Sequence, residues 1–323
     1  MTPGEIRVDP LTGLRVIVAP ERAGRPGALA AVAPAAPIDP AVDPFAPGHE
    51  AETPPTLAAH GPETGGWTAR AFANRYPALV GDPPHPAPEA KPDLFGAVPA
   101  LGAHEVIVNA PESVASLADL QTSQVADAVE LWRERMRAHA AAAYVHVHVN
   151  ERPEAGASLA HSHAQLYAMD FVPALVARER ERFGAHAVRT MGGNLLADLV
   201  QEEVRRRDRI VAIDDEAVLM VPWAARAPYA LLLAPRRTRG AFEDEGPTGA
   251  ALLHDGLRRL ARRFGASPPL NLWIRTAPRG AEHFCWHIDV LPRLAVQAGL
   301  ELGTGVELNV VSPEQAADEL RNA

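Results

Sequence analysis

Hydrophobic and polar residues alternate along this chain in short runs that are separated by turn-forming stretches. Alternation with a period of two is typical of strands that bury one face, whereas apolar residues three and four positions apart are typical of helices. The first pattern predicts strands at 14–19, 105–108, 144–149, 210–221 as two runs, 230–235, 270–276 and 284–291. The second predicts helices at 116–143, 173–183, 194–207, 249–264 and 313–321.

The longest predicted helical segment, 116–143, has a clear apolar face. Six side chains on that face are expected to point into a core: Leu117, Leu120, Val125, Val129, Leu131 and Met136. Residues 27–62 and 81–92 follow neither period and are rich in Ala and Pro, so we expect irregular loops there.

The order of the predicted elements occurs twice. Strand, strand, helix, strand, strand appears in the first half of the chain and again in the second. This repeat predicts an internal duplication in an α+β fold with two tandem halves, each an antiparallel sheet with helices packed on one face. We expect the first half to span residues 1–185 and the second to span residues 186–323.

Composition and charge narrow the classes of function. The chain has 323 residues and a formal net charge of −9, with basic residues scattered among acidic ones, so no nucleic-acid surface is expected. A single cysteine, Cys285, excludes an internal disulfide. The sequence has no apolar run long enough to span a bilayer and no signal peptide, so we expect a cytoplasmic protein without a membrane partner.

The segment 156–165, GASLAHSHAQ, carries the strongest chemical signal. In an extended chain, the side chains of His161, His163 and Gln165 project to the same side. A neutral imidazole is a competent nucleophile toward phosphorus, and an uncharged amide can donate a hydrogen bond to a phosphoryl oxygen. Gly156 lets the backbone approach a ligand closely, and the Ser158 hydroxyl can reach a phosphate oxygen. From the spacing alone, a metal-binding His-X-His pair and a polar strand edge remain alternatives.

The second half has no equivalent pair of histidines. Residues 286–289, WHID, occupy the corresponding place and contain one imidazole only, that of His287. We therefore expect only the first half to be catalytic.

Several separate motifs, in order from about residue 5 to the end of the chain, carry a resemblance to a known family. They are 22–26 (RAGRP), 74–79 (NRYPAL), 158–165 (SLAHSHAQ), 286–293 (WHIDVLPR) and 298–305 (AGLELGTG). Together they resemble galactose-1-phosphate uridylyltransferase, a branch of the histidine triad superfamily. The resemblance implies that both halves are histidine-triad-like and that the catalytic row lies in the first.

The resemblance implies a role for each residue of the row. His163 is the nucleophile that attacks the α-phosphorus of UDP-glucose, releases glucose 1-phosphate and forms a uridylyl-histidine. A sugar 1-phosphate such as galactose 1-phosphate then takes the uridylyl group, which predicts ping-pong kinetics. Gln165 holds the phosphoryl group and Ser158 contacts the leaving phosphate. The backbone of His161 accepts a hydrogen bond from the other ring nitrogen of His163 and fixes its tautomer.

Four further residues match substrate-binding positions of the family. Arg22 and Arg25 correspond to positions that contact nucleotide phosphate across a subunit boundary, which implies a homodimer. Without the resemblance, both could be solvated surface arginines. Asn74 and Asn150 correspond to positions near the uridine and the phosphates, although in isolation they would be ordinary turn formers.

The zinc ligands of the family are mostly absent from this chain. Asp43 and Ala46 stand where many members have a Cys-X-X-Cys motif, and Ser113 stands at an upstream histidine, so only His161 remains. One histidine cannot make the tetrahedral four-ligand site of a structural zinc. No spacing recommends a replacement among His49, His60, His104, His146 and His148. We expect the loops at 43–50 and 109–113 to be held by packing alone.

A second metal position of some members is also altered. Glu203 and His287 match its ligands, but the other two positions hold Arg275 and Cys285. The positive charge of Arg275 would repel a cation. We therefore expect neither zinc nor iron, and no cofactor.

The substrate stays open. Ser162 stands between the two histidines where the best-known uridylyltransferases have Pro, and a Ser there is similar to a sister group that phosphorolyses ADP-glucose. A phosphorylase of ADP-sugars or dinucleoside polyphosphates, using the same histidine, is therefore an alternative to the uridylyltransferase. A nucleotide-binding protein without turnover is a third interpretation, suggested by the lost metal ligands and opposed by the presence of both His163 and Gln165.

Overall fold

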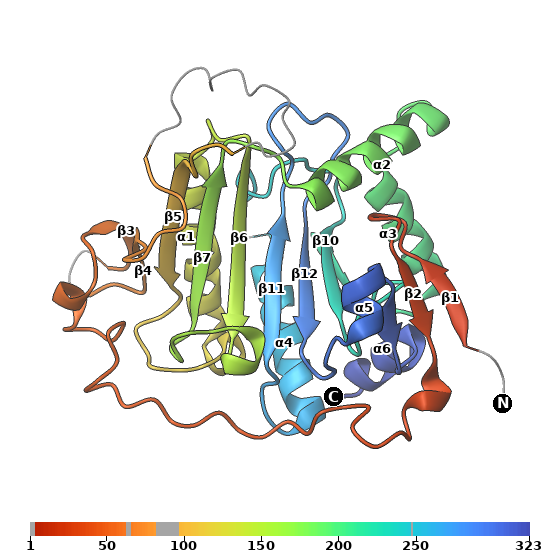
Figure 1. Cartoon of the computed structure of the whole chain (residues 1–323), viewed down its shortest axis with the longest axis horizontal. Helices are drawn as coiled ribbons and strands as arrows, with labels where there is room; N and C mark the ends of the chain where they lie inside the picture. The colour runs from red at the N-terminus through yellow and green to blue at the C-terminus, as the bar shows by residue number, and fades with distance from the viewer. Residues whose placement is uncertain (1–3, 63–65, 82–96, 247) are drawn as a thin grey trace.

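A ten-stranded antiparallel sheet forms the centre of the structure, a computed structural model that describes residues 4–62, 66–81, 97–246 and 248–323. The strand order is β3-β4-β5-β7-β6-β11-β12-β10-β9-β8 (Figure 1). The strands are β3 (Thr56–His60), β4 (Ala69–Ala73), β5 (Gly102–Val108), β6 (Tyr144–Glu151), β7 (His163–Met169), β8 (Ile210–Ile213), β9 (Ala217–Met220), β10 (Leu231–Pro235), β11 (Leu270–Arg275) and β12 (His287–Pro292).

The sheet contains the same strand order twice. The first half reads β3-β4-β5-β7-β6, and the second half, read from the other edge, reads β8-β9-β10-β12-β11. The halves join where β6 pairs with β11, with Glu151 opposite Leu270 and His148 opposite Trp273. The predicted α+β duplication is therefore confirmed, although the two halves share one continuous sheet. The boundary expected near residue 185 falls inside helix α2 (Ala174–Thr190) and stays a prediction.

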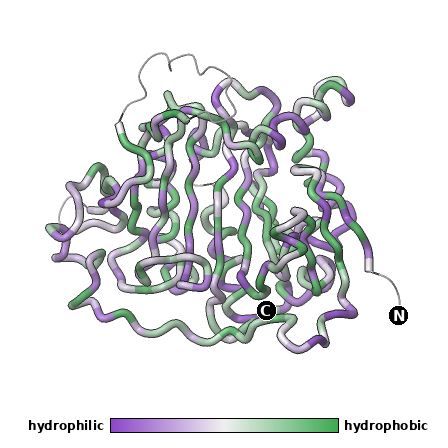
Figure 2. Tube along the Cα trace, in the orientation of Figure 1, coloured by the Kyte–Doolittle hydropathy of each residue, from purple (hydrophilic) through white to green (hydrophobic). Residues whose placement is uncertain are grey.

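One face of the sheet is apolar and is covered by helices α1 (Thr122–Ala138) and α4 (Ala250–Phe264). Side chains of the central strands that alternate toward these helices, such as Val147, Leu166 and Ile274, are fully buried. The six inward-facing side chains predicted for 116–143 are all buried as well, with Leu117 in a short 3₁₀ turn before α1. This face therefore forms the main core, and Figure 2 shows the hydrophobic strand segments that contribute to it.

On the opposite face, Phe45 packs on β4 and β5 in the first half of the sheet, and the helices of the described chain lie over the second half. There, side chains of α2 and of α3 (Leu195–Arg206) share a second buried cluster with residues of β9 and β10. A small sheet lies beside them (Figure 1), made of β1 (Glu5–Val8), β2 (Arg15–Val18) and β13 (Glu307–Asn309), the last pairing parallel with β2. The remaining helices are α5 (Gly299–Thr304) and α6 (Pro313–Arg321).

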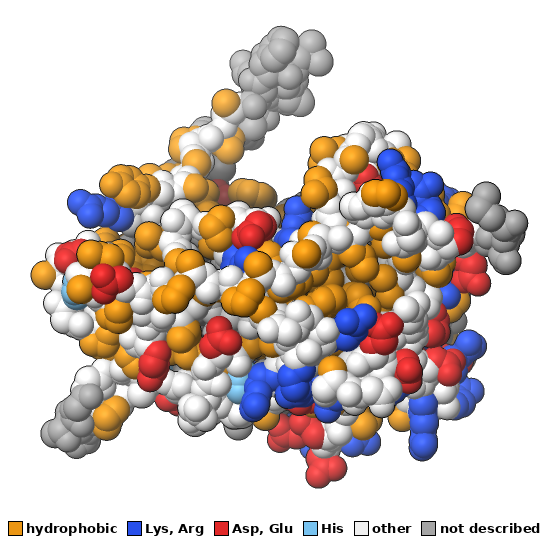
Figure 3. All heavy atoms as spheres, turned by 90° about the horizontal axis from the view of Figure 1, so that it is seen from below, with side chains coloured by type: hydrophobic (Ala, Val, Ile, Leu, Met, Phe, Trp, Pro, Cys, Tyr) orange, Lys and Arg blue, Asp and Glu red, His pale blue; other side chains and the backbone are white. Residues whose placement is uncertain are grey.

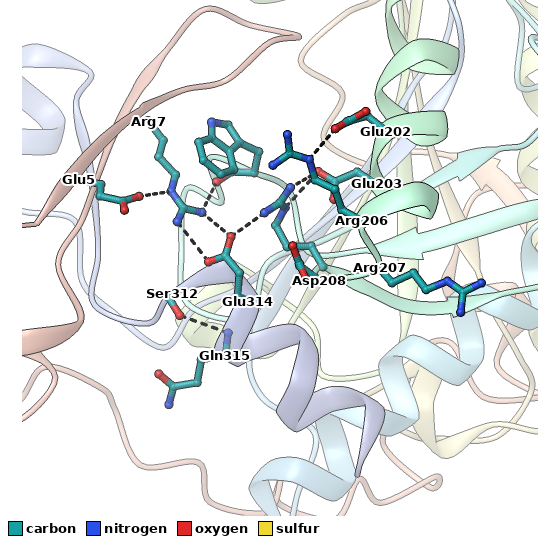
Figure 4. Close-up of polar contacts among 12 residues, drawn as sticks. Glu5, Arg7, Glu202, Glu203, Arg206, Arg207, Asp208, Ser312, Glu314 and Gln315 are labelled. Atoms are coloured by element: carbon teal, nitrogen blue, oxygen red, sulfur yellow. Dashed lines mark hydrogen bonds and ion pairs between the residues drawn. The ribbon is translucent and has the colours of Figure 1, made fainter.

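The start of the chain is attached to its end by ion pairs. Arg7 of β1 binds Glu314 of α6 (Figure 4), with Nη1 and Oε1 2.9 Å apart, and Nη1 of Arg209 lies 2.6 Å from the same oxygen. Residues at the N-terminus, which the sequence places in the first half, thus pack on the second half. Charges of both signs are mixed on the lower face of the molecule (Figure 3).

Four of the described strands, β1, β3, β4 and β13, were not predicted from the sequence. β3 lies within the segment expected to be a loop, and β4 had no prediction, because both are short and Ala-rich and gain their strand conformation from pairing with neighbours. The predicted strand at 284–291 begins later, at His287. Most of the loop expected at 81–92 lies outside the described residues. Within the described parts of the chain, no helix has the length and apolar character needed to cross a membrane.

Candidate active site

His163 is the first residue of β7 and lies on the face of the sheet that no helix of the described chain covers over β5, β7 and β6 (Figure 1). Its Nδ1 donates a hydrogen bond to the carbonyl oxygen of His161, 2.7 Å away. Burial lowers the pKa of His163, so the ring is neutral near pH 7. Because Nδ1 carries the proton, the lone pair is on Nε2, which is the atom that could attack an electrophile.

Gln165 is the next residue of β7 on the same face, and its amide is oriented by His104 of β5. The backbone N–H of Ala78 donates to Nδ1 of His104 at 3.1 Å, so the ring proton is on Nε2. That proton is donated to Oε1 of Gln165 at 3.0 Å. The amide nitrogen of Asn74 lies 3.0 Å from the same Nε2, but in this tautomer both nitrogens carry protons, so Asn74 contacts the ring without a hydrogen bond to it. The amide nitrogen of Gln165 therefore faces away from His104 and is available as a donor.

Asn150 is brought next to His163 by strand pairing. The register of β6 and β7 places Val149 opposite Ala164, and one further residue places Asn150 opposite His163. Gly156, in the turn that follows β6, has φ of 91°, a left-handed conformation in which side chains are strained. A β-carbon at Gly156 would lie 3.9 Å from the amide nitrogen of Asn150. The backbone of Gly156, the amide of Asn150 and the imidazole of His163 therefore lie close together.

More neutral imidazoles lie on the same face than the sequence analysis assigned to the site. Burial lowers the pKa of His146 to about 3 and that of His148 to about 4. The two rings stack with centroids 5.3 Å apart, and Tyr167 stacks on His104 at 3.9 Å. These rings make a polar but uncharged surface beside His163. The alternation of His146, His148 and Asn150 in β6 is a local signal that they share one face, whereas their position beside His163 depends on the pairing of β5, β6 and β7.

The side chain of His161 is held in a hydrogen-bonded network. Nδ1 lies 2.6 Å from Oδ2 of Asp43, and Nε2 lies 2.8 Å from the carbonyl oxygen of Ala110. Ser113 donates to the same carboxylate oxygen at 2.6 Å. Burial raises the pKa of Asp43, but hydrogen bonds from Ser113, His161 and the Phe45 N–H outweigh that effect and lower the pKa overall. Both ring nitrogens of His161 therefore face oxygen acceptors, one on the Asp43 carboxylate and one on the Ala110 backbone.

This network corrects the expectation that packing alone holds the two loops. Asn109 adds further bonds: its amide donates to Ser162 Oγ at 3.0 Å, and Trp132 donates to its carbonyl oxygen at 3.0 Å. Phe45, which the sequence analysis did not single out, packs edge-on against His163 with ring centroids 5.4 Å apart. The loop that begins at Asp43 therefore supports the nucleophile from two sides.

The residues at the family's zinc position do not fit a zinc ion. Both nitrogens of His161 are engaged with oxygen atoms, so neither is free for a metal. Ala46 has no ligand atom, and the Asp43 carboxylate is engaged by His161 and Ser113. In the described part of the chain, no three His, Cys, Asp or Glu side chains are grouped to hold a metal ion.

At the second metal position, the sequence analysis assigned the wrong glutamate. Glu203, on α3, pairs with Arg209 at 3.0 Å in the cluster around Glu314, seen in Figure 4. The carboxylate beside Arg275 belongs instead to Glu179 of α2, 3.2 Å away. Burial raises the pKa of Glu179 to about 8. The guanidinium of Arg275 lies against this carboxylate and its positive charge would repel a cation, so this position does not fit a metal either.

The second half nevertheless copies one feature of the nucleophile. His287 is the first residue of β12, the counterpart of β7, and its Nδ1 lies 3.2 Å from the carbonyl oxygen of Cys285. The position equivalent to Gln165 is Asp289, a carboxylate, and its Oδ2 lies 3.9 Å from His287 Nε2. A carboxylate there is unsuited to binding a phosphoryl oxygen, and that only the first half is catalytic stays a prediction.

Two predicted site residues, Arg22 and Arg25, do not join this cluster within one chain. Arg22 and Arg25 are exposed, in and just after the 3₁₀ turn Pro20–Arg22. That turn follows β2 and lies at the second-half end of the molecule, far along the sheet from β7 (Figure 1). Ser158 is exposed in the segment between β6 and β7.

Fold and site together define a class: a nucleotide-transferring protein of the histidine triad superfamily. Residues 3–173 match the family described as galactose-1-phosphate uridyl transferase, N-terminal domain. Residues 119–323 also match a domain of unknown function, DUF4921. The chain belongs to the galactose-1-phosphate uridyl transferase family.

Relatives that match along nearly the whole chain carry two different names. An ADP-glucose phosphorylase of Arabidopsis thaliana is 27% identical over 330 residues, covering 98% of this chain and 92% of the relative. A galactose-1-phosphate uridylyltransferase of Cryptococcus neoformans is 28% identical over 347 residues, covering 98% of this chain and 89% of the relative. Among solved structures, a GalT-like protein from Arabidopsis thaliana matches with a TM-score of 0.81 and 25% identity, covering 99% of both chains.

Proposed function

We propose that this protein transfers a nucleotidyl group from a nucleoside diphosphate sugar to an acceptor phosphate through a covalent intermediate on His163. The observation that supports this most directly is the 2.7 Å hydrogen bond from Nδ1 to the His161 carbonyl oxygen, which leaves the lone pair of a neutral ring on Nε2. An imidazole in this state needs no separate base to become a nucleophile.

The bond changes of the first half-reaction involve His163 and groups near it in the same chain. Nε2 of His163 forms a bond to the α-phosphorus while the bond between that phosphorus and the oxygen of glucose 1-phosphate breaks, and the leaving group takes the electron pair. No proton donor is required, because a phosphate is a stable leaving group. The positive charge that develops on the ring faces the His161 carbonyl oxygen. Gln165 and Asn150 donate to the phosphoryl oxygens, Gly156 lets the substrate approach the backbone, and Ser158 contacts the leaving phosphate.

For the second half-reaction, the primary candidate acceptor is a hexose 1-phosphate such as galactose 1-phosphate, with UDP-glucose as donor. A phosphate oxygen of the acceptor attacks the nucleotidyl phosphorus, the bond from phosphorus to Nε2 breaks, and a new UDP-sugar leaves. This makes the protein a UDP-glucose:hexose-1-phosphate uridylyltransferase with ping-pong kinetics. Family membership and the uridylyltransferase relatives support it.

A second candidate is the phosphorolysis of ADP-glucose. Inorganic phosphate would then attack an adenylyl group on His163, and ADP would leave. Two observations favour it: the plant ADP-glucose phosphorylase matches 98% of this chain, and Ser162 separates the two histidines. The chemistry at His163 is the same in both candidates, so they differ in the base and in the acceptor.

We also propose a homodimer in which Arg22 and Arg25 of each subunit complete the site of the other. Both arginines are exposed and lie at the far end of the sheet from β7, so neither belongs to the site around His163 of its own chain. Guanidinium groups suit the phosphate oxygens that Gln165 and Asn150 do not reach.

The protein works without a structural metal in this proposal. The hydrogen-bonded pair of Asp43 and His161, with Ser113 as a third member, links the loops at the position where family members have zinc. A polar pair of this kind is stable when buried only if its remaining hydrogen-bonding positions are filled, as they are by Ala110 and Phe45.

The experiment that tests the function uses intact-protein mass spectrometry. The protein is mixed separately with UDP-glucose and with ADP-glucose, without acceptor. A gain of one uridylyl group supports the uridylyltransferase, and a gain of one adenylyl group supports the phosphorylase. Subsequent addition of galactose 1-phosphate or inorganic phosphate identifies the acceptor by which one removes the adduct.

A further inference from the structure

Asn271 lies on β11 of the second half and is directly opposite Asn150 of β6 in the sheet. Its amide nitrogen donates two hydrogen bonds of 2.8 Å, one to the carbonyl oxygen of Ala155 and one to Oδ1 of Asn150. The two asparagines line a single groove on the open face, which extends to Arg293 on the far side. Asn271 is thus a contact between the two halves of the molecule at the edge of the site.

These two bonds determine which way the Asn150 amide points. A backbone carbonyl can only accept, so the atom of Asn271 that faces Ala155 must be the nitrogen. The same nitrogen faces Asn150, so the atom of Asn150 that receives its second proton must be the oxygen. The oxygen of Asn150 is therefore directed toward β11, and its nitrogen is directed toward Gly156. Within the described residues, that nitrogen donates to no protein acceptor.

We infer that Asn271 is a positioning residue that holds the amide nitrogen of Asn150 toward the phosphoryl group of the substrate. The inference rests on the proposed function, because it assumes that a phosphoryl group binds beside His163. Asn271 itself touches no substrate. The arrangement is the same as the one in which His104 orients Gln165. In both cases a partner donates a hydrogen bond to the amide oxygen and leaves the amide nitrogen free.

The orientation matters because a phosphoryl group has only acceptor oxygens near its phosphorus. An amide nitrogen stabilises these oxygens by donating to them, whereas an amide oxygen in the same place would repel them. A rotated Asn150 would therefore both lose a hydrogen bond and add a repulsion. Without Asn271, no hydrogen bond to the Asn150 oxygen would favour the orientation in which the Asn150 nitrogen faces the substrate.

Two substitutions at Asn271 separate positioning from simple packing. Asn271→Ala frees the Asn150 amide to take either orientation, and we expect the rate of His163 nucleotidylation in a single turnover to fall about fivefold. Asn271→Asp has nearly the same shape but offers only acceptors, so it should attract the Asn150 nitrogen and direct the oxygen to the substrate. We expect it to lower the rate about fiftyfold. A structural role for Asn271 gives the opposite order, with Asp the milder change.

The background of Asn150→Ala provides the control. If Asn271 acts through Asn150, the double variant Asn150→Ala/Asn271→Asp reacts at the same rate as Asn150→Ala alone. Thermal unfolding of each variant shows whether the fold persists, and Asn271→Ala keeps the test usable if the Asp variant does not fold. Equal rates for wild type, Asn271→Ala and Asn271→Asp would overturn the inference, as would additive losses in the double variant.

The outcomes also distinguish this inference from the proposed function. If the wild-type protein forms no adduct with either nucleotide sugar, the proposed function is wrong, whatever the Asn271 variants do. If wild type forms the adduct and the Asp variant forms it equally fast, the function stands and the positioning role of Asn271 is wrong.

Discussion

Oδ2 of Asp43 lies 2.6 Å from Nδ1 of His161, although 118 residues separate the two in the chain. The carbonyl group of the same His161 holds the nucleophilic ring of His163 by its Nδ1. One residue thus connects a loop near the start of the chain to the atom that would carry the chemistry. In this account, a hydrogen-bonded pair has the structural task that zinc has in other members of the family.

The first prediction concerns metal content. Wild-type protein purified without chelators should contain well under one zinc per chain, because the residues at Asp43, Ala46 and Ser113 offer no tetrahedral set. The variant Asp43→Cys/Ala46→Cys/Ser113→His, which supplies three ligands beside His161, should retain about one zinc per chain. Elemental analysis measures both. A stoichiometric zinc in the wild-type protein would show that our interpretation of this network is wrong.

His104 should matter to the rate even though it does not reach the reacting atoms. In His104→Phe the ring can still stack on Tyr167, but Gln165 loses the donor that orients its amide. We expect single-turnover nucleotidylation to slow about tenfold, with a small change in thermal stability. The matched control is His60→Phe on edge strand β3, where the ring binds Glu134 at 2.9 Å. A full rate in His104→Phe would contradict the orienting role.

The pH dependence follows from the sign of the pKa shift. Burial lowers the pKa of His163, and the neutral ring is the reactive form, so the half-maximal rate should lie below the ordinary histidine pKa of about 6.5. Release of glucose 1-phosphate in a single turnover, measured between about pH 4.5 and 8, tests this. A half-maximal rate at or above about pH 6.5 would contradict it.

Folding stability must be measured alongside, because His146 and His148 also resist protonation. Their pKa values are lowered to about 3 and about 4, while in the unfolded chain they are ordinary. The unfolded state therefore binds more protons as the pH falls below about 6.5, and the free energy of unfolding should decline in that range. Circular dichroism at each pH separates a loss of fold from protonation of His163.

The shared site can be tested by complementation. The His163→Gly variant and the Arg22→Ala/Arg25→Ala variant should each be inactive alone. When the two chains are co-expressed, a mixed dimer contains one site with an intact His163 and intact partner arginines, so activity should reappear. Mixtures that stay inactive, or an arginine variant that is active by itself, would contradict the proposed arrangement.

Local patterns predicted most of the fold because helical and strand periodicities are properties of short segments. The six apolar residues of 116–143 and the alternation at 144–149 needed no knowledge of the rest of the chain. The strands that were not predicted depend instead on pairing with distant segments. β3 and β4 have weak strand propensity and depend on β5 for their hydrogen bonds.

The candidate site was found in part for the same reason. His163 and Gln165 share a face because they are two residues apart in a strand, which the sequence alone indicates. His104, Asn271 and Phe45 join them only through strand pairing and loop packing, and no spacing in the sequence marks such contacts. Glu179 and Glu203 lie on consecutive helices, and only the three-dimensional arrangement shows which of them meets Arg275.

The most direct test of the central claim is the mass of the intact protein after mixing with UDP-glucose or ADP-glucose. We predict that wild-type protein gains one nucleotidyl group and releases glucose 1-phosphate, that the adduct maps to His163, and that His163→Gly gains none while keeping its fold. Free imidazole should then restore part of the transfer in that variant. Turnover without any adduct, or an adduct that persists in His163→Gly, would contradict the account.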